Sequence, residues 1–368
     1  MNDGNFTGEA LDLAQQALCL SPPNPRVGCI IASPDGHILG AGHTQAAGQA
    51  HAEVMALRDA AARGNSVTGA TAWVTLEPCS HQGRTGPCCD ALVAAGIRKV
   101  VASLQDPNPL VGGQGFGRLR AAGVEVQVGP GAAQARELNI GFFSRMIRKS
   151  PWVRMKIAAS LDGQTALDNG ASQWITSEAA RTDGHAWRAR ADAVLTGIGT
   201  VLEDDPQLDV RLVPTPRQPH LVVVDSRLET PLDARLFTGG RKLLIYAAVD
   251  DGDRAAALQS RGATVVHMPG PGGKVDLAGM LRDLATHHEV NELHVEAGHK
   301  LNGSLVRESL VDEYLVYLAP RLLGQGRGMA SIGPLESLQG AVPLAFHSSE
   351  MVGPDLRIIA RGTGRADF

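Results

Sequence analysis

The sequence has little of what membrane proteins and nucleic-acid-binding proteins need. No apolar run reaches the roughly 18 residues that span a bilayer. The N-terminal segment carries Asp3, Glu9 and Asp12 but no basic residue before Arg26, so it lacks the basic start of a signal peptide. The formal net charge of −4 gives no overall basic field that would attract nucleic acid or an anionic membrane. We therefore expect a small-molecule substrate, with neither nucleic acid nor membrane as a partner.

Aromatic residues and cysteines are also scarce. Aromatics make up 4% of the 368 residues, whereas 43 glycines and 43% hydrophobic residues suit a globular α/β protein with many tight loops. The length favours two domains. Five cysteines are an odd number, and two of them stand where metal ligands would, which argues against a disulfide framework. A reducing compartment, the cytoplasm, is the expected location.

The dinucleotide fingerprint is missing from the second half. No G-x-G-x-x-G opens a helix directly after a strand there. Two glycine-containing loops, 197–200 and 295–298, do follow expected strands and offer backbone N–H groups to phosphates. Glycine-rich turns are more often only turns, so these loops alone do not establish a nucleotide site.

The chemistry that the sequence does carry is concentrated between residues 51 and 90. His51-Ala52-Glu53 is followed by Pro78-Cys79 and by Pro87-Cys88. Zn²⁺ takes thiolate and imidazole ligands, and a catalytic site keeps three protein ligands with one open position, which His51, Cys79 and Cys88 would satisfy. Glu53 is then the candidate acid/base that takes a proton from zinc-bound water and passes it on. The arrangement is typical of hydrolytic deaminases.

Two alternatives remain beside a catalytic deaminase centre. A structural zinc site would use Cys89 as a fourth ligand, although adjacent cysteines rarely both reach one tetrahedral metal. A nucleic-acid or nucleoside deaminase with an appended binding domain is the other, and the net charge and the lack of a basic, aromatic platform count against it.

The insert between the two cysteines departs from the general deaminase signature, in which only two residues separate them. This longer insert, 80–87, carries His81 and Arg84 and resembles that of the bifunctional deaminase/reductase family of riboflavin biosynthesis. Further blocks similar to the same family are 156–163, 172–176, 200–206, 295–298 and 310–313. The resemblance covers almost the whole chain. It implies a cytidine-deaminase-like three-layer α/β/α domain over residues 1–148 and a dihydrofolate-reductase-like α/β domain over residues 151–368.

The resemblance also implies two successive reactions. The first is zinc-dependent hydrolytic deamination of 2,5-diamino-6-(5-phosphoribosylamino)pyrimidin-4(3H)-one. The second is NADPH-dependent reduction of the ribose of 5-amino-6-(5-phosphoribosylamino)uracil to the ribityl form. One zinc ion and NADPH are thus the expected cofactors, and a homo-oligomer formed through the reductase domain is allowed.

The family's contact residues can be carried over position by position. In the deaminase domain the substrate contacts map onto Asn24, His81, Arg84, Asp106 and Asn108. In the reductase domain they map onto Ser172, Arg188, Leu208, Arg211 and Glu296, and the NADPH contacts map onto Ala158, Trp174, Thr200, Asp204, Ser226 and Gly298. Lys156 and Glu296 are favoured as the catalytic, substrate-orienting groups. Arg227 is a candidate reader of the NADPH 2′-phosphate, from its charge and position.

Two departures from the family pattern are visible. The segment before His51 is one residue longer than usual, so no ligand role is assigned to His43, and His299-Lys300 stand where Pro-Thr is more usual. Hydrophobic periodicity predicts a helix at 7–20 with Thr7 as N-cap, a hairpin at 27–39 and a single helix at 132–147. In the second half it predicts a helix capped by Ser177 and the strands 152–159, 193–196, 221–224, 242–246, 263–267, 292–295 and 313–318.

Overall fold

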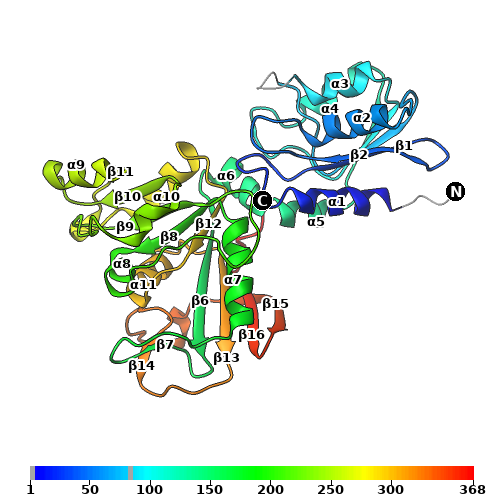
Figure 1. Ribbon diagram of the computed structural model, residues 1–368. Helices are drawn as coiled ribbons and strands as arrows, with labels where there is room; N and C mark the ends of the chain where they lie inside the picture. Colours follow the sequence, from blue (N-terminus) through cyan, green and yellow to red (C-terminus); the bar gives the residue numbers. More distant parts are fainter. Residues whose placement is uncertain (1–4, 82–85) are drawn as a thin grey trace. The chain divides into compact units, whose positions relative to one another are not determined.

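The computed structural model describes residues 5–81 and 86–368, and the chain divides into two compact units, Met1–Lys149 and Ser150–Phe368 (Figure 1). Both units are mixed α/β structures, as the sequence predicts. Among the described residues, no helix is both long enough and apolar enough to cross a bilayer.

The first unit is built on a five-stranded sheet of order β2-β1-β3-β4-β5. Strand β1 pairs antiparallel with both β2 and β3, whereas β3, β4 and β5 are parallel. The β1–β2 pair confirms the expected hairpin. The strands are β1 (Gly28–Ala32), β2 (Ile38–His43), β3 (Thr71–Val74), β4 (Lys99–Ala102) and β5 (Glu125–Val128).

Helices cover both faces of this sheet, because small residues on alternate strand positions let helix backbones approach. A Cβ at Gly28 would lie 1.9 Å from the Ala10 carbonyl oxygen of α1, and one at Gly42 would lie 2.6 Å from the Ala56 nitrogen of α2. Gly28 and Gly42 stand on opposite faces, since Gly42 is the pairing partner of Cys29. The helices are α1 (Phe6–Gln16), α2 (Ala52–Ala62), α3 (Cys88–Ala94), α4 (Gln114–Ala121), α5 (Ala132–Leu138) and α6 (Ile140–Arg148). The expected three-layer arrangement is confirmed.

Two helix predictions in this unit are wrong in detail. The N-cap of α1 is Asn5, whose side chain accepts a hydrogen bond from the Gly8 N–H at 3.1 Å, so Thr7 lies inside the helix, which ends at Gln16. The expected single helix 132–147 is two helices that meet at Asn139. The Asn139 side chain accepts from the Arg26 N–H at 2.7 Å and donates to the Arg26 carbonyl at 2.9 Å, and this backbone-like pairing accompanies the break.

The second unit contains a nine-stranded sheet of order β11-β10-β9-β8-β12-β6-β13-β16-β15. The strands from β11 to β13 are parallel, and β16 and β15 add an antiparallel edge. The strands are β6 (Trp152–Ser160), β8 (Ala193–Gly197), β9 (His220–Val224), β10 (Leu243–Ala247), β11 (Ala263–His267), β12 (Glu292–Val295), β13 (Glu313–Ala319), β15 (Leu344–Val352) and β16 (Asp355–Gly362). A separate pair joins β7 (Gln164–Leu167) to β14 (Gly326–Gly328).

The helices of the second unit are α7 (Glu178–Arg190), α8 (Ile198–Asp204), α9 (Gly252–Ser260), α10 (Leu277–Thr286) and α11 (His299–Arg307). Ser177 caps α7 as expected, accepting a hydrogen bond from the Ala180 N–H. One face of the sheet packs Val153, Met155 and Val295 against α10 and α11 in an apolar core. The opposite face of β6 and β12 is polar although it is buried.

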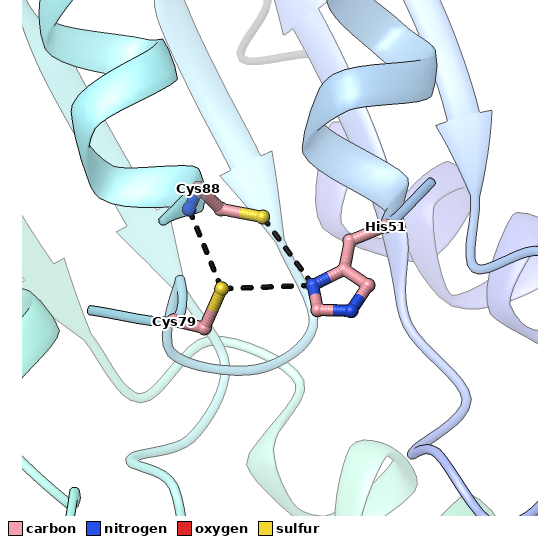
Figure 2. Close-up of side chains that lie close together, drawn as sticks. All are labelled: His51, Cys79 and Cys88. Carbon is pink, nitrogen blue, oxygen red and sulfur yellow. Dashed lines mark hydrogen bonds between the residues drawn. The ribbon is translucent and has the colours of Figure 1, made fainter. Parts of the chain in front are cut away.

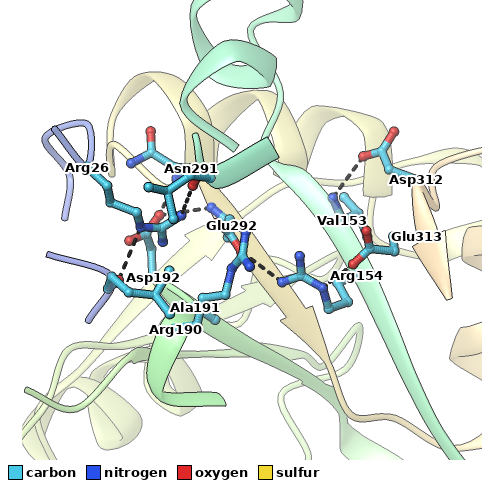
Figure 3. Close-up of polar contacts among 12 residues, drawn as sticks. Arg26, Val153, Arg154, Arg190, Ala191, Asp192, Asn291, Glu292, Asp312 and Glu313 are labelled. Atoms are coloured by element: carbon cyan, nitrogen blue, oxygen red, sulfur yellow. Dashed lines mark hydrogen bonds and ion pairs between the residues drawn. The ribbon is translucent and has the colours of Figure 1, made fainter. Parts of the chain in front are cut away.

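Charged side chains occupy this second, buried face (Figure 3). Arg154 donates to Glu292 at 2.8 Å and also to Glu313, and all three side chains are at most 1% exposed. Arg190 and Arg361 add further ion pairs, to Glu292 at 2.7 Å and to Glu313 at 2.7 Å. We call Arg154, Arg190, Glu292, Glu313 and Arg361 the buried charge cluster.

Candidate functional site

The three expected metal ligands converge in the first unit (Figure 2). His51 is the N-cap of α2, Cys79 follows β3, and Cys88 is the first residue of α3. The His51 Nδ1 atom lies 3.6 Å from the Cys79 sulfur and 3.4 Å from the Cys88 sulfur. The three ligand atoms lie within 4.8 Å of one another, a spacing that one ion can bridge.

The chemistry of this donor set fits Zn²⁺. The Cys88 N–H donates to the Cys79 sulfur at 3.3 Å. A hydrogen bond from the Cys88 thiol lowers the pKa of Cys79 although burial opposes the shift, and the same hydrogen bond raises the pKa of Cys88. A thiolate is therefore favoured at the position where a metal needs one.

Cys89 does not join the group. Its sulfur is directed toward the Asp90 carboxylate at 3.7 Å, and burial raises the pKa of its thiol to about 11. Among the residues that the structure describes, the metal-binding group contains His51, Cys79 and Cys88 only. Three ligands leave one coordination position for water, as catalytic zinc sites do.

Glu53 lies in the first turn of α2, beside the three ligands. Its side chain is buried, with 4% of the residue exposed. Burial, followed by the negative charge of Cys79, raises the pKa of Glu53 to about 7. A carboxyl group with this pKa can both take up and release a proton near neutral pH.

The expected substrate contacts of this unit lie on separate loops. Asn24 closes a turn in which its N–H donates to the Ser21 carbonyl at 2.9 Å. Asp106 and Asn108 lie on the loop after β4, where Asp106 accepts from the Asn108 N–H at 2.8 Å. Burial raises the pKa of Asp106, while the hydrogen bond from the Asn108 N–H opposes the shift. Arg84 lies outside the described residues.

In the second unit Lys156, Arg188 and Glu296 converge from β6, α7 and the end of β12. Arg188 Nε lies 2.7 Å and Lys156 Nζ lies 3.7 Å from the Glu296 carboxylate. Although burial favours the neutral acid, these two cations hold the pKa of Glu296 well below its ordinary value. The carboxylate stays ionised and is held in place by two cations.

A neighbouring loop brings two more of the expected residues to this group. Arg188 also donates to the carbonyl oxygen of Asp209, and Arg211 pairs with the Asp209 carboxylate at 2.5 Å. Leu208, on the same loop, is buried in a left-handed conformation with φ of 53°. Ser172 lies half-buried between β7 and α7.

The expected NADPH contacts fall into two sets. Thr200, Ser226 and Gly298 follow the carboxyl ends of β8, β9 and β12, which are parallel neighbours in the sheet, so they lie at one edge. A Cβ at Gly298 would lie 3.8 Å from the Thr200 hydroxyl oxygen, so the two glycine-containing loops meet. Ala158 is half-buried within β6, Asp204 is exposed at the end of α8, and Trp174 is 60% exposed and stacks with Arg181.

Comparison with known proteins agrees with this geometry. Residues 1–104 match the cytidine and deoxycytidylate deaminase zinc-binding region, and residues 151–358 match the RibD C-terminal domain. The chain is 43% identical to the riboflavin biosynthesis protein RibD of Escherichia coli (strain K12), covering 97% of this chain and 98% of that protein. The RibD of Aquifex aeolicus is 39% identical, with 97% of each chain covered. The chain belongs to the RibD family.

Solved structures of RibD proteins have the same fold. A structure of Acinetobacter baumannii RibD superposes with a TM-score of 0.89 at 38% identity, covering 97% of this chain and 98% of that one. A deaminase/reductase of Thermotoga maritima superposes with a TM-score of 0.84 at 29% identity, covering 97% of each chain. The expected fold class and the expected bifunctional deaminase/reductase of riboflavin biosynthesis, zinc-dependent in one half and NADPH-dependent in the other, are confirmed. Neither alternative, a nucleic-acid deaminase or a structural zinc protein, is favoured.

Three residues beside the two sites were not predicted from the sequence. Glu77 accepts a hydrogen bond from the Asp106 N–H at 3.1 Å. His185 accepts a hydrogen bond from the Arg211 N–H at 3.1 Å, and His294 is buried with its Nε2 3.5 Å from Glu296. His185 could have been predicted because it lies three residues before Arg188 and therefore on the same face of the helix. His294 could have been predicted because it alternates with Glu292 and Glu296 along the strand and therefore points to the same side.

Proposed function

We propose that residues 1–148 form the deaminase domain and residues 151–368 the reductase domain. The division of the chain after Lys149 and the two family matches support this assignment. The observation that carries the deaminase role is the convergence of His51, Cys79 and Cys88 beside the buried Glu53. The proposed substrate is 2,5-diamino-6-(5-phosphoribosylamino)pyrimidin-4(3H)-one.

In the deaminase domain His51, Cys79 and Cys88 would hold the zinc ion. A zinc ion bound there would lower the pKa of water toward neutrality, which makes a nucleophile available for the amino-bearing ring carbon. Glu53 takes the proton of that water on its carboxylate and delivers it to the leaving amine, which departs as ammonia. The burial of Glu53 in the first turn of α2, two residues from His51, supports this role.

The remaining proposed deaminase residues orient the substrate. Asp106 and Asn108, on one loop, and Asn24 and His81, on two others, offer polar groups to the pyrimidinone ring and the ribose. Arg84 is proposed to anchor the phosphate, because a guanidinium suits bidentate contact with phosphate oxygens.

In the reductase domain Lys156 and Glu296 are proposed to act at the ribose. Bound NADPH would supply the hydride for the ribose C1 of the open form. Lys156 lies 3.7 Å from Glu296 and is proposed to orient the sugar and to donate a proton to its oxygen, with Glu296 orienting Lys156. Arg211 is half exposed and is proposed to bind the phosphate. Arg188 forms an ion pair with Glu296 and is proposed to contact the substrate at that position. Ser172 and Leu208 are proposed as further substrate contacts.

The six remaining reductase residues are proposed to bind NADPH. Thr200, Ser226 and Gly298 would meet the cofactor at the carboxyl edge of the sheet, where ligands of open α/β sheets bind. Ala158, Trp174 and Asp204 complete the proposed set, and Arg227 is proposed to read the 2′-phosphate.

A coupled assay on the purified, zinc-loaded protein tests both activities. The deaminase substrate is supplied, and ammonia release and NADPH oxidation are followed separately. We expect ammonia first and NADPH oxidation second. Replacing Glu53 by glutamine should slow ammonia release by about 10²- to 10⁴-fold, the usual contribution of a positioned acid/base. Bound zinc and the reduction of supplied 5-amino-6-(5-phosphoribosylamino)uracil should not change, and retained deamination would refute the role of Glu53.

We further propose that the protein works in the cytoplasm on small molecules, without a nucleic-acid or membrane partner. No disulfide forms among the cysteines of the described residues, and Cys29, Cys88 and Cys89 are buried thiols, as a reducing compartment allows. The net charge of −4 also supports a small-molecule substrate, because it gives no overall basic field that would attract nucleic acid or an anionic membrane.

We also propose a homo-oligomer formed through the reductase domain. Strand β15 is the edge of the nine-stranded sheet, and it exposes Phe346 at 80% and Met351 at 63%. An edge strand with exposed apolar side chains invites pairing with another chain. Replacing Phe346 by aspartate should lower the mass measured by light scattering, whereas a monomeric mass for the unmodified protein would refute the proposal.

A further inference from the structure

A single buried carboxylate ties the segment that carries Cys79 to a loop some 30 residues further along the chain. Glu77 precedes Pro78 and Cys79, and only 6% of the residue is exposed. One of its oxygens accepts hydrogen bonds from the Asp106 N–H at 3.1 Å and the Gly113 N–H at 2.8 Å. The other accepts from the Gly115 N–H at 2.8 Å and the Phe116 N–H at 3.2 Å. All four donors are backbone groups of the loop after β4 and of the start of α4.

The loop is shaped to meet this carboxylate. A Cβ at Gly115 would lie 2.1 Å from the Pro78 carbonyl oxygen, and one at Gly112 would lie 2.6 Å from the Asp106 carbonyl oxygen. Gly113 has a φ of 83°, in the region that favours glycine. The backbone therefore approaches the 77–79 segment more closely than side chains would allow.

The same loop presents two of the proposed substrate contacts. Asp106 donates its N–H to Glu77 and accepts on its side chain from the Asn108 N–H, so the carboxylate fixes the backbone from which both side chains project. Cys79 lies two residues beyond Glu77, and its sulfur belongs to the metal-binding group. One side chain thus sets the position of the substrate loop relative to the metal ligands.

We propose that Glu77 is a positioning residue for deamination, holding the Asp106–Asn108 loop at the distance from the metal-binding group that the pyrimidinone ring requires. The proposal rests on the proposed function, in which Asp106 and Asn108 bind the substrate. It concerns hydrogen-bond geometry: four N–H donors need two acceptor oxygens, and a carboxylate supplies both.

The test is Glu77→Gln, which keeps the shape of the side chain and replaces one acceptor oxygen by an NH₂ group. Whichever way the amide is oriented, the NH₂ faces two N–H donors, so two of the four hydrogen bonds are lost and donors oppose one another. We expect the KM for ammonia release to rise about tenfold, with kcat changed by less than about threefold, since each lost hydrogen bond is typically worth a factor of about 2 to 10. Zinc content should stay the same, and hydrogen exchange at Gly113, Gly115 and Phe116 should become faster.

Two further variants serve as a control and as an independent perturbation of the loop. Asp59→Asn changes a carboxylate of the same unit that accepts the Ala41 N–H at 2.9 Å, away from the loop, and should leave the KM unchanged. Gly113→Ala loosens the loop from its other side by placing a Cβ at a positive φ, and should raise the KM in the same direction even if Glu77→Gln fails to retain zinc.

Asn108→Ala separates the inference from the proposed function. If Asn108→Ala leaves the KM unchanged, the substrate role of the loop is wrong and the proposed function needs correction. If Asn108→Ala raises the KM whereas Glu77→Gln and Gly113→Ala do not, the positioning role of Glu77 is overturned. A rise in KM for all three variants, with zinc retained, supports both.

Discussion

Replacing Glu313 by glutamine should destabilise the second unit by about 3 kcal/mol. Glu313 accepts a hydrogen bond from Arg154 on one oxygen (Figure 3). Its other oxygen accepts from Arg361 at 2.7 and 2.9 Å, and Arg154 is as buried as Glu313 itself. Removing one partner of a buried ion pair costs about 3–5 kcal/mol, because the remaining charge stays out of water. Glutamine keeps one acceptor oxygen, so the lower end of that range applies.

The assay is calorimetry on the full-length chain, with the transition of the second unit identified by its shift when NADPH is added. For a unit of this size about 1 kcal/mol moves the melting temperature by about 2–4 °C, so the variant should melt about 6–12 °C lower. The transition of the first unit should not move. Glu350→Gln is the matched control, since Glu350 pairs with Arg357 on the same sheet but is 55% exposed. Exposed pairs contribute at most about 1 kcal/mol.

The effect should also depend on pH in one direction. Burial opposes ionisation of Glu313, but Arg154 and Arg361 hold its pKa below the ordinary value of 4.5. The stability that ionised Glu313 contributes is therefore complete above about pH 4.5 and is lost as the pH falls through the lowered pKa. The difference between the variant and the unmodified protein should shrink in acid. A loss near pH 7 no larger than that of Glu350→Gln would refute the reasoning.

Three further outcomes are expected. Removing zinc with a chelator should stop ammonia release but leave NADPH oxidation intact when 5-amino-6-(5-phosphoribosylamino)uracil is supplied, and added zinc should restore the first step; equal loss of both activities would argue against separate sites. Arg227→Ala should reduce the preference for NADPH over NADH. The Arg227 side chain is 71% exposed and, among the contacts described, is paired only with Glu229 at 3.3 Å, so it can bind a phosphate. An unchanged ratio of kcat/KM for the two donors would show that Arg227 does not bind the 2′-phosphate. Burial, followed by Arg188 and Arg211, lowers the pKa of His185 from 6.5 to about 4, so the unfolded chain binds a proton that the folded chain excludes, and stability should fall as the pH drops from about 6.5 to 4. His185→Asn keeps an acceptor for the Arg211 N–H and should flatten that part of the profile in urea titrations, and an unaltered profile would contradict the assignment.

The metal-binding group was predictable because its chemistry is carried by few residue types in a fixed order. Imidazole and thiolate ligands with a nearby carboxylate have few other uses in such an arrangement. The parallel strands of the second unit were predictable for a similar reason, since strands buried on both faces appear as apolar runs bounded by turns.

Features that depend on contacts between distant segments were not predictable. Asn139 breaks a periodic helical pattern by pairing with the backbone of Arg26, more than a hundred residues away. In the sequence Glu77 is only the residue before Pro78-Cys79. Its role depends on the loop after β4, whose backbone N–H groups donate hydrogen bonds to its carboxylate. Strand β15 is almost wholly exposed, so it lacks the alternation between buried and exposed residues by which a strand is detected.

The buried charge cluster and the proposed reductase site share one face of one sheet. Alternate residues of β12 and of the segment after it, Glu292, His294 and Glu296, point toward α7, and each glutamate binds an arginine of that helix. His294 lies between them, and burial lowers its pKa, so it remains neutral near pH 7 and adds no third cation to the row. Glu292 therefore pairs with Arg154 and Arg190, while Glu296 pairs with Lys156 and Arg188. Because Glu292 and Glu296 both bind arginines of α7, the ion pairs of the cluster and those of the proposed reductase site hold the same helix against this face.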